Sequence, residues 1–160
     1  MALLGPLDGH VFGAGQPCYG CGPQHTSGFR LAFERDGDAV VTTVRPGDHH
    51  QGAPGLLHGG LAALLCDEIA AWAIIAKPGK FAFTTTMNVR YTGPLRVSDD
   101  IVGRGWVVRD GRRMVETAAT LSQGGVVAVE AELKFVVLDR KGTEKLLMSE
   151  LPPDWVKFVR

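Results

Sequence analysis

The segment HGGLAALLCDEIAAWA, residues 58–73, is the most hydrophobic stretch of the chain and decides the predicted fold. Two glycines stand where a helix would begin, and two adjacent carboxylates interrupt an otherwise apolar run. A helix that is apolar on nearly all sides must be covered by other elements and does not suit a protein surface. We therefore predict a central, enclosed helix that ends near the KPGK sequence at residues 77–80.

Strand-like runs stand on both sides of this helix. Two precede it, at residues 29–35 and 39–45, joined by a DGD turn. Four follow it, at residues 81–93, 101–109, 112–122 and 126–138, with turn signals between them. The order β-β-α-β-β-β-β predicts an α+β fold in which a curved antiparallel sheet wraps around the helix.

The ends of the chain differ in composition from its middle. Residues 1–26 are rich in Gly, Pro and His and predict an irregular N-terminal arm, and residues 27–139 form the predicted folded domain. Residues 140–160 form a C-terminal tail, in which a short helix is expected to be broken at Pro152 and Pro153. A chain of 160 residues is long enough for one such domain with a real core.

Composition narrows the classes of partner and location. Lys plus Arg and Asp plus Glu each number 17, which argues against electrostatic nucleic-acid binding, although a local basic patch stays open. No signal peptide is expected from the first residues. A membrane span at residues 56–76 is disfavoured because each carboxylate near mid-bilayer costs ~2.5 kcal/mol or more. Three cysteines do not suggest a disulfide framework, so a cytoplasmic setting is expected.

The glycines at the start of the helix point to a binding site for negative charge. Backbone N–H groups in a first helical turn lack intrahelical partners and lie at the positive end of the helix dipole. Gly59 and Gly60 have no side chain to keep a ligand away, so a developing oxyanion would bind here. The alternative is that the two glycines only permit a tight turn or close packing.

The two carboxylates are predicted to differ in role because they face different sides of the helix. At about 100° per residue, Asp67 shares its side with small residues such as Gly60 and Ala63. Glu68 shares its side with large residues such as Trp72. A substrate can approach Asp67 more closely, so Asp67 is the predicted general base or nucleophile and Glu68 is assigned to packing. The alternative for Asp67 is a structural carboxylate at a subunit contact.

The cysteines suggest two other chemistries, which the spacing favours less. Cys66 lies about 100° around the helix from Asp67 and has no histidine nearby in the sequence, so a buried apolar role is expected. The pair Cys18 and Cys21, followed by His25, invites a zinc interpretation. A structural zinc site needs four ligands, and only three lie close together here, with His10 a distant fourth. We therefore expect no metal and assign the pair to packing of the arm, with zinc as the less favoured alternative.

Two segments together resemble a known family. GLLHGGLAALLCDEIAAWA at residues 55–73, followed by TTTMNVRYTGPL at residues 84–95, resembles the PaaI-like branch of the hotdog-fold acyl-CoA thioesterases. CYGCGPQHTSGFRLAF at residues 18–33 resembles the opening of a bacterial subgroup of that branch. The resemblance covers roughly residues 18–138 and implies a hotdog fold, in agreement with the predicted order of elements.

The resemblance implies a catalytic site at the start and middle of the helix. The backbone N–H of Gly59 would polarise the thioester carbonyl, and Asp67 would activate water or attack that carbonyl. Thr84, on the following strand, would assist the acid. His58 would shape the loop and contact the thioester.

One position departs from the family pattern. Many relatives carry an Asn six residues before the histidine as a second carbonyl contact, and this chain has Gly52 there. Gln51 and His50 are the candidates to replace this Asn. The polar face of the following strand, which carries Thr84, is expected to line the site as well. The predicted substrate-binding residues are Gly60, Gln51, His50, Thr86 and Asn88.

The leading functional hypothesis is hydrolysis of an acyl-CoA thioester to a free acid and CoA, without a metal or organic cofactor. The resemblance also implies a homodimer with shared active sites, often paired into a tetramer. The alternative is a non-catalytic acyl-CoA or lipid-binding module on the same fold. A hydratase ranks third, because hydratases of this superfamily usually place an Asp before a His near the helix start. The acyl group and the choice between CoA and carrier protein stay open.

Overall fold

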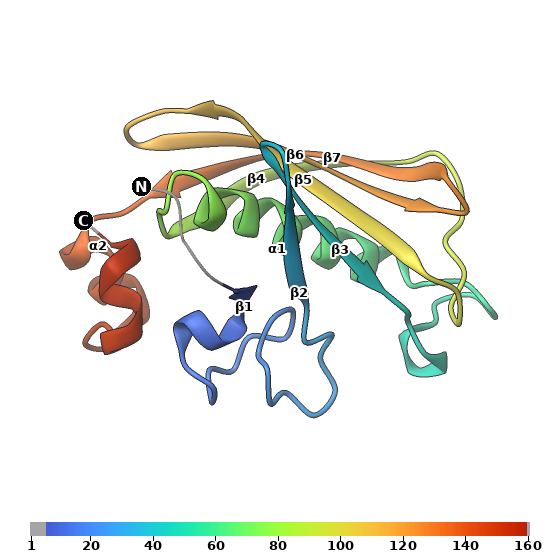
Figure 1. Cartoon of the computed structure of the whole chain (residues 1–160), viewed down its shortest axis with the longest axis horizontal. Coiled ribbons are helices and arrows are strands. Elements are labelled where there is room, and N and C mark those ends of the chain that lie inside the picture. The colour runs from blue at the N-terminus through green and yellow to red at the C-terminus, as the bar shows by residue number, and fades with distance from the viewer. Residues whose placement is uncertain (1–5, 160) are drawn as a thin grey trace.

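The architecture follows from one apolar helix and the strands that cover it. The computed structural model describes residues 6–159, so residues 1–5 of the predicted arm and Arg160 of the predicted tail lie outside the described residues. Helix α1 spans Gly59–Ala76 and lies against one face of a curved sheet (Figure 1). The predicted α+β fold, a curved antiparallel sheet around one central helix, is confirmed.

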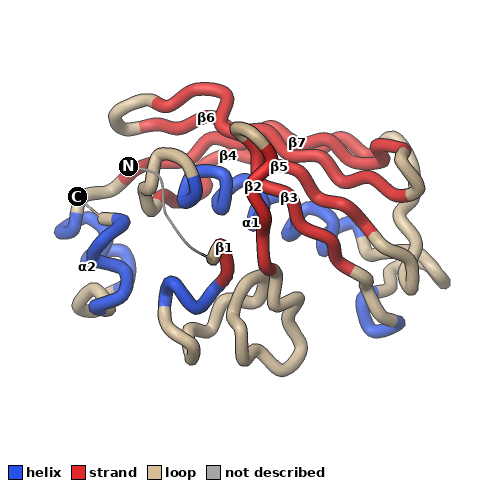
Figure 2. The backbone as a smooth tube through the Cα atoms, in the orientation of Figure 1, coloured by secondary structure: helices blue, strands red, loops and turns tan. Residues whose placement is uncertain are grey.

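The sheet contains all six predicted strands and one short strand from the arm. Neighbouring strands are antiparallel and pair in the order β1-β2-β3-β5-β6-β7-β4, forming one curved layer (Figure 2). β4 therefore lies at an edge, and within residues 6–159 only one of its sides is paired. The strands are β1 Leu7–Asp8, β2 Ala32–Asp36, β3 Ala39–Val44, β4 Ala82–Tyr91, β5 Ile101–Asp110, β6 Met114–Gln123 and β7 Val126–Val137.

Helix α1 packs directly on the strand backbone. Leu65, Ile69 and Trp72 are fully buried between the sheet and the rest of the chain. A Cβ atom on Gly105 of β5 would lie 2.9 Å from the backbone oxygen of Ile69, closer than side-chain carbons approach. Glycine at this position therefore lets the helix approach the sheet, which brings the middle of α1 and its carboxylates close to the strands.

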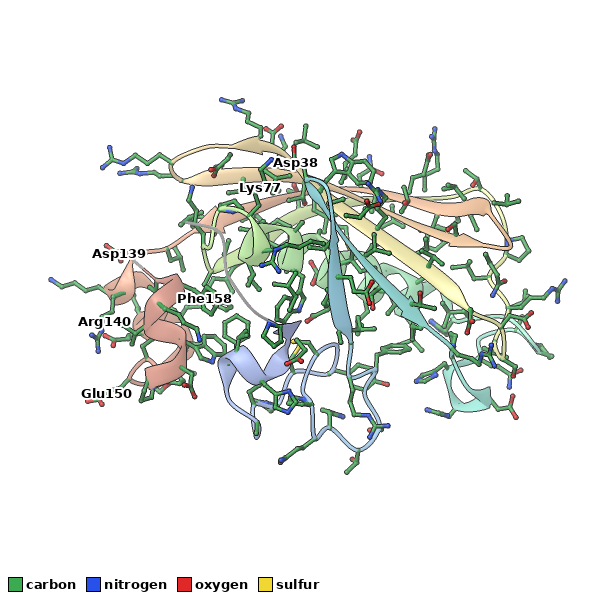
Figure 3. All side chains as sticks on the ribbon, in the orientation of Figure 1. Asp38, Lys77, Asp139, Arg140, Glu150 and Phe158 are labelled. Atoms are coloured by element: carbon green, nitrogen blue, oxygen red, sulfur yellow. The ribbon has the colours of Figure 1, made fainter. Side chains whose placement is uncertain are left out.

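The arm and the tail pack against each other across the C-terminal part of α1. The arm contains β1 and a 3-10 helix at Gly9–Phe12, so the prediction of a wholly irregular arm is wrong. The Phe12 ring lies 5.9 Å from that of Trp72 and 4.9 Å from that of Phe158, which points from the tail toward the arm (Figure 3). The Trp155 side chain also donates a 3.2 Å hydrogen bond to the Phe12 carbonyl. Both ends of the chain therefore cover the core.

The tail helix differs from the prediction in position and in the way it ends. Helix α2 spans Arg140–Leu147 and begins at Asp139, whose side chain accepts a hydrogen bond from the Gly142 N–H. It ends at Met148, which has a left-handed conformation with φ 53°. Pro152 comes after this end and therefore does not break the helix. A second 3-10 helix, Pro153–Phe158, follows.

By length and composition, α1 would suffice to cross a membrane, with a mean hydropathy of 1.6 over 18 residues. More than half of this helix is buried inside the protein, as in the core helix of a globular domain. Burial beneath the sheet accounts for its apolar character.

Candidate active site

The start of α1 presents one free backbone donor. His58 is the N-cap residue, and its Nδ1 atom accepts a 2.9 Å hydrogen bond from the Gly60 N–H. The N–H of Gly59 has no acceptor among the described residues, and Gly59 is exposed. The predicted oxyanion donor is therefore available at Gly59, whereas the Gly60 N–H is already used by the cap.

Tyr91 at the end of β4 is a neighbour of this donor that sequence reasoning missed. Its hydroxyl donates a 2.6 Å hydrogen bond to the Gly59 carbonyl, and burial raises the pKa of this phenol. Tyr91 and Gly59 also line a small pocket of about 100 Å³. The remaining lining residues are mostly apolar: Leu56, Leu57, Ala62, Gly93, Pro94, Leu95 and Val129. Strict alternation places Tyr91 on the face opposite Thr84, and the register shift between Thr84 and Thr86 brings both residues to the α1 side.

Asp67 and Thr84 meet in the middle of α1, as the resemblance implied. Thr84, on β4, donates a 2.5 Å hydrogen bond from its Oγ1 atom to Oδ1 of Asp67. Asp67 is half-buried, and Thr84 is exposed on the edge strand. The second carboxylate oxygen of Asp67 stays available for a water molecule or a substrate. The pair therefore forms an oriented acid at the open edge of the sheet.

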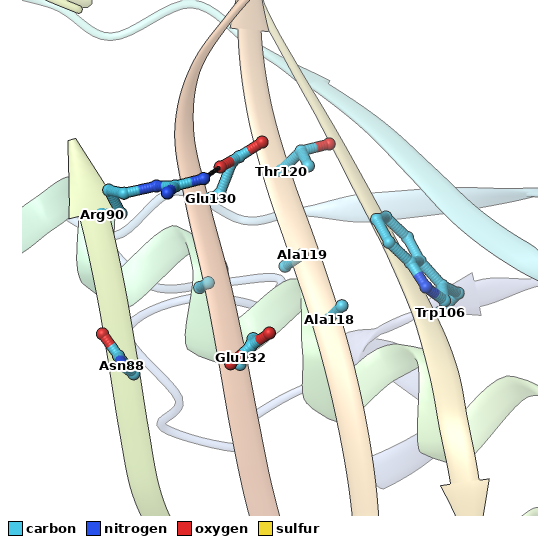
Figure 4. A pocket seen from close by; sticks show the side chains of 9 residues that line it. Asn88, Arg90, Trp106, Ala118, Ala119, Thr120, Glu130 and Glu132 are labelled. Atoms are coloured by element: carbon cyan, nitrogen blue, oxygen red, sulfur yellow. Dashed lines mark hydrogen bonds and ion pairs between the residues drawn. The ribbon is translucent and has the colours of Figure 1, made fainter. Parts of the chain in front are cut away.

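Thr86 and Asn88 do not share the face of Thr84, and this expectation is wrong. The register of β4 against β7 shifts between Thr84 and Thr86, which marks a β-bulge. One extra residue reverses the alternation of side chains along a strand. Asn88 therefore lines a hollow of about 370 Å³ on the outer face, with α1 behind the sheet (Figure 4). Thr86 lines a second hollow beside it, of about 400 Å³.

The loop before α1 does not offer the predicted replacement for the missing Asn. The Gln51 side chain donates to the Asp48 carbonyl at 2.9 Å and accepts from the Gly55 N–H at 2.5 Å, so both ends of its amide are used. His50 is buried and stacks on Phe29 with ring centroids 4.5 Å apart. A replacement for the missing Asn needs a side chain that can reach the substrate, whereas the structure uses both side chains to hold the loop.

His50 nevertheless contributes to the site through its backbone. Its carbonyl accepts a 2.9 Å hydrogen bond from the His58 N–H, which fixes the N-cap residue. Burial, and then the neighbouring His49, lower the pKa of His50. Its Nδ1 accepts from the Gly47 N–H at 3.0 Å, and its buried Nε2 has no partner in the described chain. His50 therefore positions the helix start through its carbonyl group.

The two adjacent carboxylates separate as predicted from the helix geometry. Glu68 turns away from the Asp67 side, accepts a 3.1 Å hydrogen bond from the Trp72 indole and lies beneath the arm. Burial raises the pKa of Glu68 to about 7. Hydrogen bonding to Cys21 lowers the pKa of the neighbouring Cys18 thiol to about 5, against an opposing effect of burial. Glu68 thus belongs to a separate cluster of titratable groups.

Gly59 and Asp67 of one chain are too far apart to contact the same carbonyl. Eight residues separate them along α1, which corresponds to about 12 Å at 1.5 Å per residue. An oxyanion donor must lie within about 3 Å of the reacting oxygen, and the acid must also lie close to the reacting carbon. The free Gly59 N–H and the Asp67–Thr84 pair are therefore two spatially separate groups within one chain.

A known family model matches the part of the chain that carries the candidate site. The family model described as Thioesterase superfamily matches residues 54–130, which contain α1, β4, β5, β6 and the start of β7. Just under half of the chain is therefore similar to the thioesterase superfamily. The resemblance seen in the sequence is thereby confirmed at the segment that carries Gly59, Asp67 and Thr84.

The curated relatives match over part of their length. Acyl-coenzyme A thioesterase 13 of Homo sapiens is 31% identical over 84 residues, which is 52% of this chain and 60% of the relative. The mouse protein of the same name is 24% identical over 86 residues, covering 53% of this chain and 61% of the relative. The chain thus spans less than two thirds of the relatives' length.

Solved structures support the same fold. A crystal structure of a thioesterase superfamily protein has a TM-score of 0.69 and 28% identity, covering 75% of this chain and 63% of that protein. A Streptococcus mutans protein bound to acetyl CoA has a TM-score of 0.62 and 23% identity, covering 67% and 87%. A Ralstonia eutropha protein described as phenylacetic acid degradation-related has a TM-score of 0.61 and 19% identity, covering 67% and 84%. The predicted hotdog fold is confirmed.

Proposed function

We propose that this chain hydrolyses acyl-CoA thioesters to a free acid and CoA, with Asp67 as the general base or nucleophile. The observation that carries the proposal is the hydrogen bond from Thr84 on β4 to Asp67 on α1. The first N–H group of the same helix, that of Gly59, is free to bind the carbonyl oxygen. The substrate class is supported by the name of the human relative and by the acetyl CoA bound to the Streptococcus mutans protein.

In the general-base route, Asp67 takes a proton from a water molecule as the water oxygen bonds to the thioester carbonyl carbon. The electron pair of the carbonyl moves onto its oxygen, which a Gly59 N–H stabilises at the positive end of a helix. When the carbonyl re-forms, the C–S bond breaks and the CoA thiolate leaves and takes up a proton. A thiolate is a good leaving group, so no strong general acid is required. Thr84 holds the carboxylate in place throughout.

In the nucleophilic route, the Asp67 carboxylate itself attacks the carbonyl carbon and expels the thiolate. The product is a mixed anhydride, which water then hydrolyses to the free acid and the restored carboxylate. A single turnover in ¹⁸O-labelled water that leaves label in Asp67 would establish the nucleophilic route. Attack of water on the aspartyl carbonyl of the anhydride leaves label in Asp67, whereas the general-base route puts all of it in the acid.

We infer further that each complete site is shared between two copies of the chain. The distance of about 12 Å between Gly59 and Asp67 along one helix supports this arrangement. The free edge of β4 supports it as well, because an exposed edge strand is a template for pairing with a second chain. Thr84 lies on this edge, so a partner that pairs with β4 would bring its own helix start toward Asp67.

The test of hydrolysis is a thiol-release assay over aliphatic, aromatic and hydroxylated acyl-CoAs. We expect Asp67→Asn to lower the turnover rate by about 100-fold or more, as for loss of a general base. Asp100→Asn, which removes an exposed carboxylate paired with Arg45, is the control and retains wild-type activity. A wild-type protein that binds acyl-CoA but releases no thiol would contradict hydrolysis and favour the binding module. Equal activity of Asp67→Asn and wild type would contradict the role of Asp67.

A further inference from the structure

The N-terminal arm places two thiols on the carboxylate that the proposed reaction does not use. The Cys18 sulfur lies 3.5 Å and 3.6 Å from the two carboxylate oxygens of Glu68. The Cys18 sulfur, the Cys21 sulfur and a Glu68 oxygen all lie within 4.8 Å of one another. The three cysteines of the chain are free thiols. Three metal-ligating groups thus converge from two segments 50 residues apart in the sequence.

The Glu68 carboxylate has no cationic side chain as a partner within the described residues. Glu68 takes part in none of the ion pairs found in residues 6–159. Its neighbours are the two thiols and the indole N–H of Trp72, which donates a single neutral hydrogen bond. Removing a carboxylate from water without a compensating cation is unfavourable. A bound divalent cation would supply the missing positive charge.

The loop that carries the thiols is arranged as a metal-binding turn. The Cys21 N–H points at the Cys18 sulfur over 3.4 Å, which orients the first ligand. The Gln16 side chain accepts from the Cys18 N–H at 2.8 Å and donates to the Cys21 sulfur at 3.5 Å. A Cβ atom on Gly20 would lie 2.6 Å from the Glu68 carboxyl carbon, so a larger residue here would displace the Glu68 carboxyl group. Such supporting contacts are typical of metal sites.

We propose that Cys18, Cys21 and Glu68 bind a divalent zinc ion that ties the N-terminal arm to helix α1. The Cys-x-x-Cys spacing is that of zinc ligands, and two thiolates with one carboxylate form a donor set that suits zinc better than calcium or magnesium. Cys18 is partly exposed, so a water molecule can complete a tetrahedral site from the solvent side.

The proposed ligand set differs from the one that the sequence suggested. His25 uses its Nδ1 atom to accept a hydrogen bond from the Gly28 N–H at 2.8 Å, and His10 pairs with Asp8. Neither histidine belongs to the cluster. The third protein ligand comes from Glu68 on the central helix, which spacing along the arm could not indicate.

A disulfide between the two cysteines is the competing interpretation. It would explain the proximity of the sulfur atoms but would leave the carboxylate of Glu68 against an apolar bridge without a counter-charge. The zinc site accounts for the thiols and the carboxylate together. It therefore predicts that the carboxylate contributes to metal affinity.

The experiment uses the full-length protein, produced in zinc-containing medium and kept reduced. Metal content is measured by plasma mass spectrometry, and Co²⁺ is then titrated into the metal-free protein while the thiolate-to-cobalt charge-transfer band is recorded. We expect about one metal ion per chain and a band that requires both cysteines. Cys18→Ser should abolish the band, and Glu68→Gln should weaken the affinity by at least about tenfold. His25→Ala and Cys66→Ser, outside the cluster, should bind as the wild type does.

Circular dichroism of each variant at low temperature separates loss of a ligand from loss of the fold. Reduced wild-type protein that retains no zinc and binds Co²⁺ without the charge-transfer band would overturn the proposal. Unchanged affinity in a folded Glu68→Gln variant would overturn the ligand set. Thiol titration of a second batch, purified without reductant, that shows Cys18 and Cys21 oxidised together in metal-free protein would establish the disulfide instead.

Discussion

Replacing Gly59 by proline removes the proposed oxyanion donor while leaving the start of α1 intact. Proline suits the first position of a helix, because its φ angle is already helical and its missing N–H has no intrahelical acceptor. His58, which precedes it, has φ −59° and ψ 131°, the extended conformation that a residue before proline prefers. No hydrogen bond to a described residue is lost. Loss of one oxyanion donor lowers the turnover rate by ~10²–10³-fold.

Gly59→Ala is the matched control because it keeps the N–H group. Its Cβ atom would lie 3.7–3.8 Å from the Tyr91 ring, which is ordinary van der Waals contact. The assay is thiol release from the best acyl-CoA of the panel, with helix content and melting temperature measured in parallel. The reasoning is refuted if folded Gly59→Pro turns over at the wild-type rate. Equal losses in the proline and alanine variants would show that steric exclusion, and not the missing donor, causes the effect.

The same variant tests whether a site is shared between chains. Mixing Gly59→Pro chains with Asp67→Asn chains produces dimers in which one site carries both changes and the other carries neither. Random pairing in a two-fold dimer then restores about one quarter of wild-type activity from two inactive proteins. If both residues of a site came from one chain, the mixture would stay inactive.

Three further predictions concern groups around this site. Thr84→Val removes a hydrogen bond to the Asp67 carboxylate worth ~1.5–3 kcal/mol. The value of kcat/KM should fall about 10- to 150-fold, and a Thr84→Ser variant that fell as far would contradict this. Gly105→Ala places a Cβ atom 2.7 Å from Ile69 Cγ2 and should lower the unfolding free energy by ~1–3 kcal/mol in urea titrations; unchanged stability would argue against close helix packing. Burial, and secondarily Asp67, raise the pKa of Cys66 to about 12, so this thiol stabilises the fold below its ordinary pKa and loses that contribution as the pH rises through about 12. It should resist a disulfide reagent at pH 8 until urea is added, and rapid labelling of folded protein would speak against its burial.

The order of elements is predictable from the sequence because hydrophobic spacing is a local property. The apolar run of α1 and the alternating runs after it indicate one helix and a sheet that covers it, without knowledge of any long-range contact. The Asp67 side of the helix follows in the same way from an angle of about 100° per residue. The contact with Thr84 needed the family resemblance as well, because spacing alone does not choose among the polar residues of the next strand.

The assignments that failed depend on events that spacing does not record. Thr86 and Asn88 were assigned by strict alternation, and a single bulge residue reversed their face. Gln51 was assigned from its position next to the missing Asn, but a loop uses its own amide side chains to satisfy its backbone. The meeting of Cys18 with Glu68 depends on the path of the arm through space. Residue spacing therefore does not predict bulges, hydrogen bonds within loops or contacts between distant segments.

The two carboxylates of α1 also help to fix the rotation of the helix about its own axis. A helix that is apolar on nearly all sides gains similar burial energy at many rotations about its axis, so apolar burial alone leaves its orientation weakly defined. Polar contacts restrict the rotation, because a buried polar group is tolerated only where its partners are. Glu68 meets the arm on one side, and Asp67 meets Thr84 about 100° away. The contacts at Glu68 therefore help to set the direction in which Asp67 points, so the arm that covers the core also orients the carboxylate proposed for catalysis.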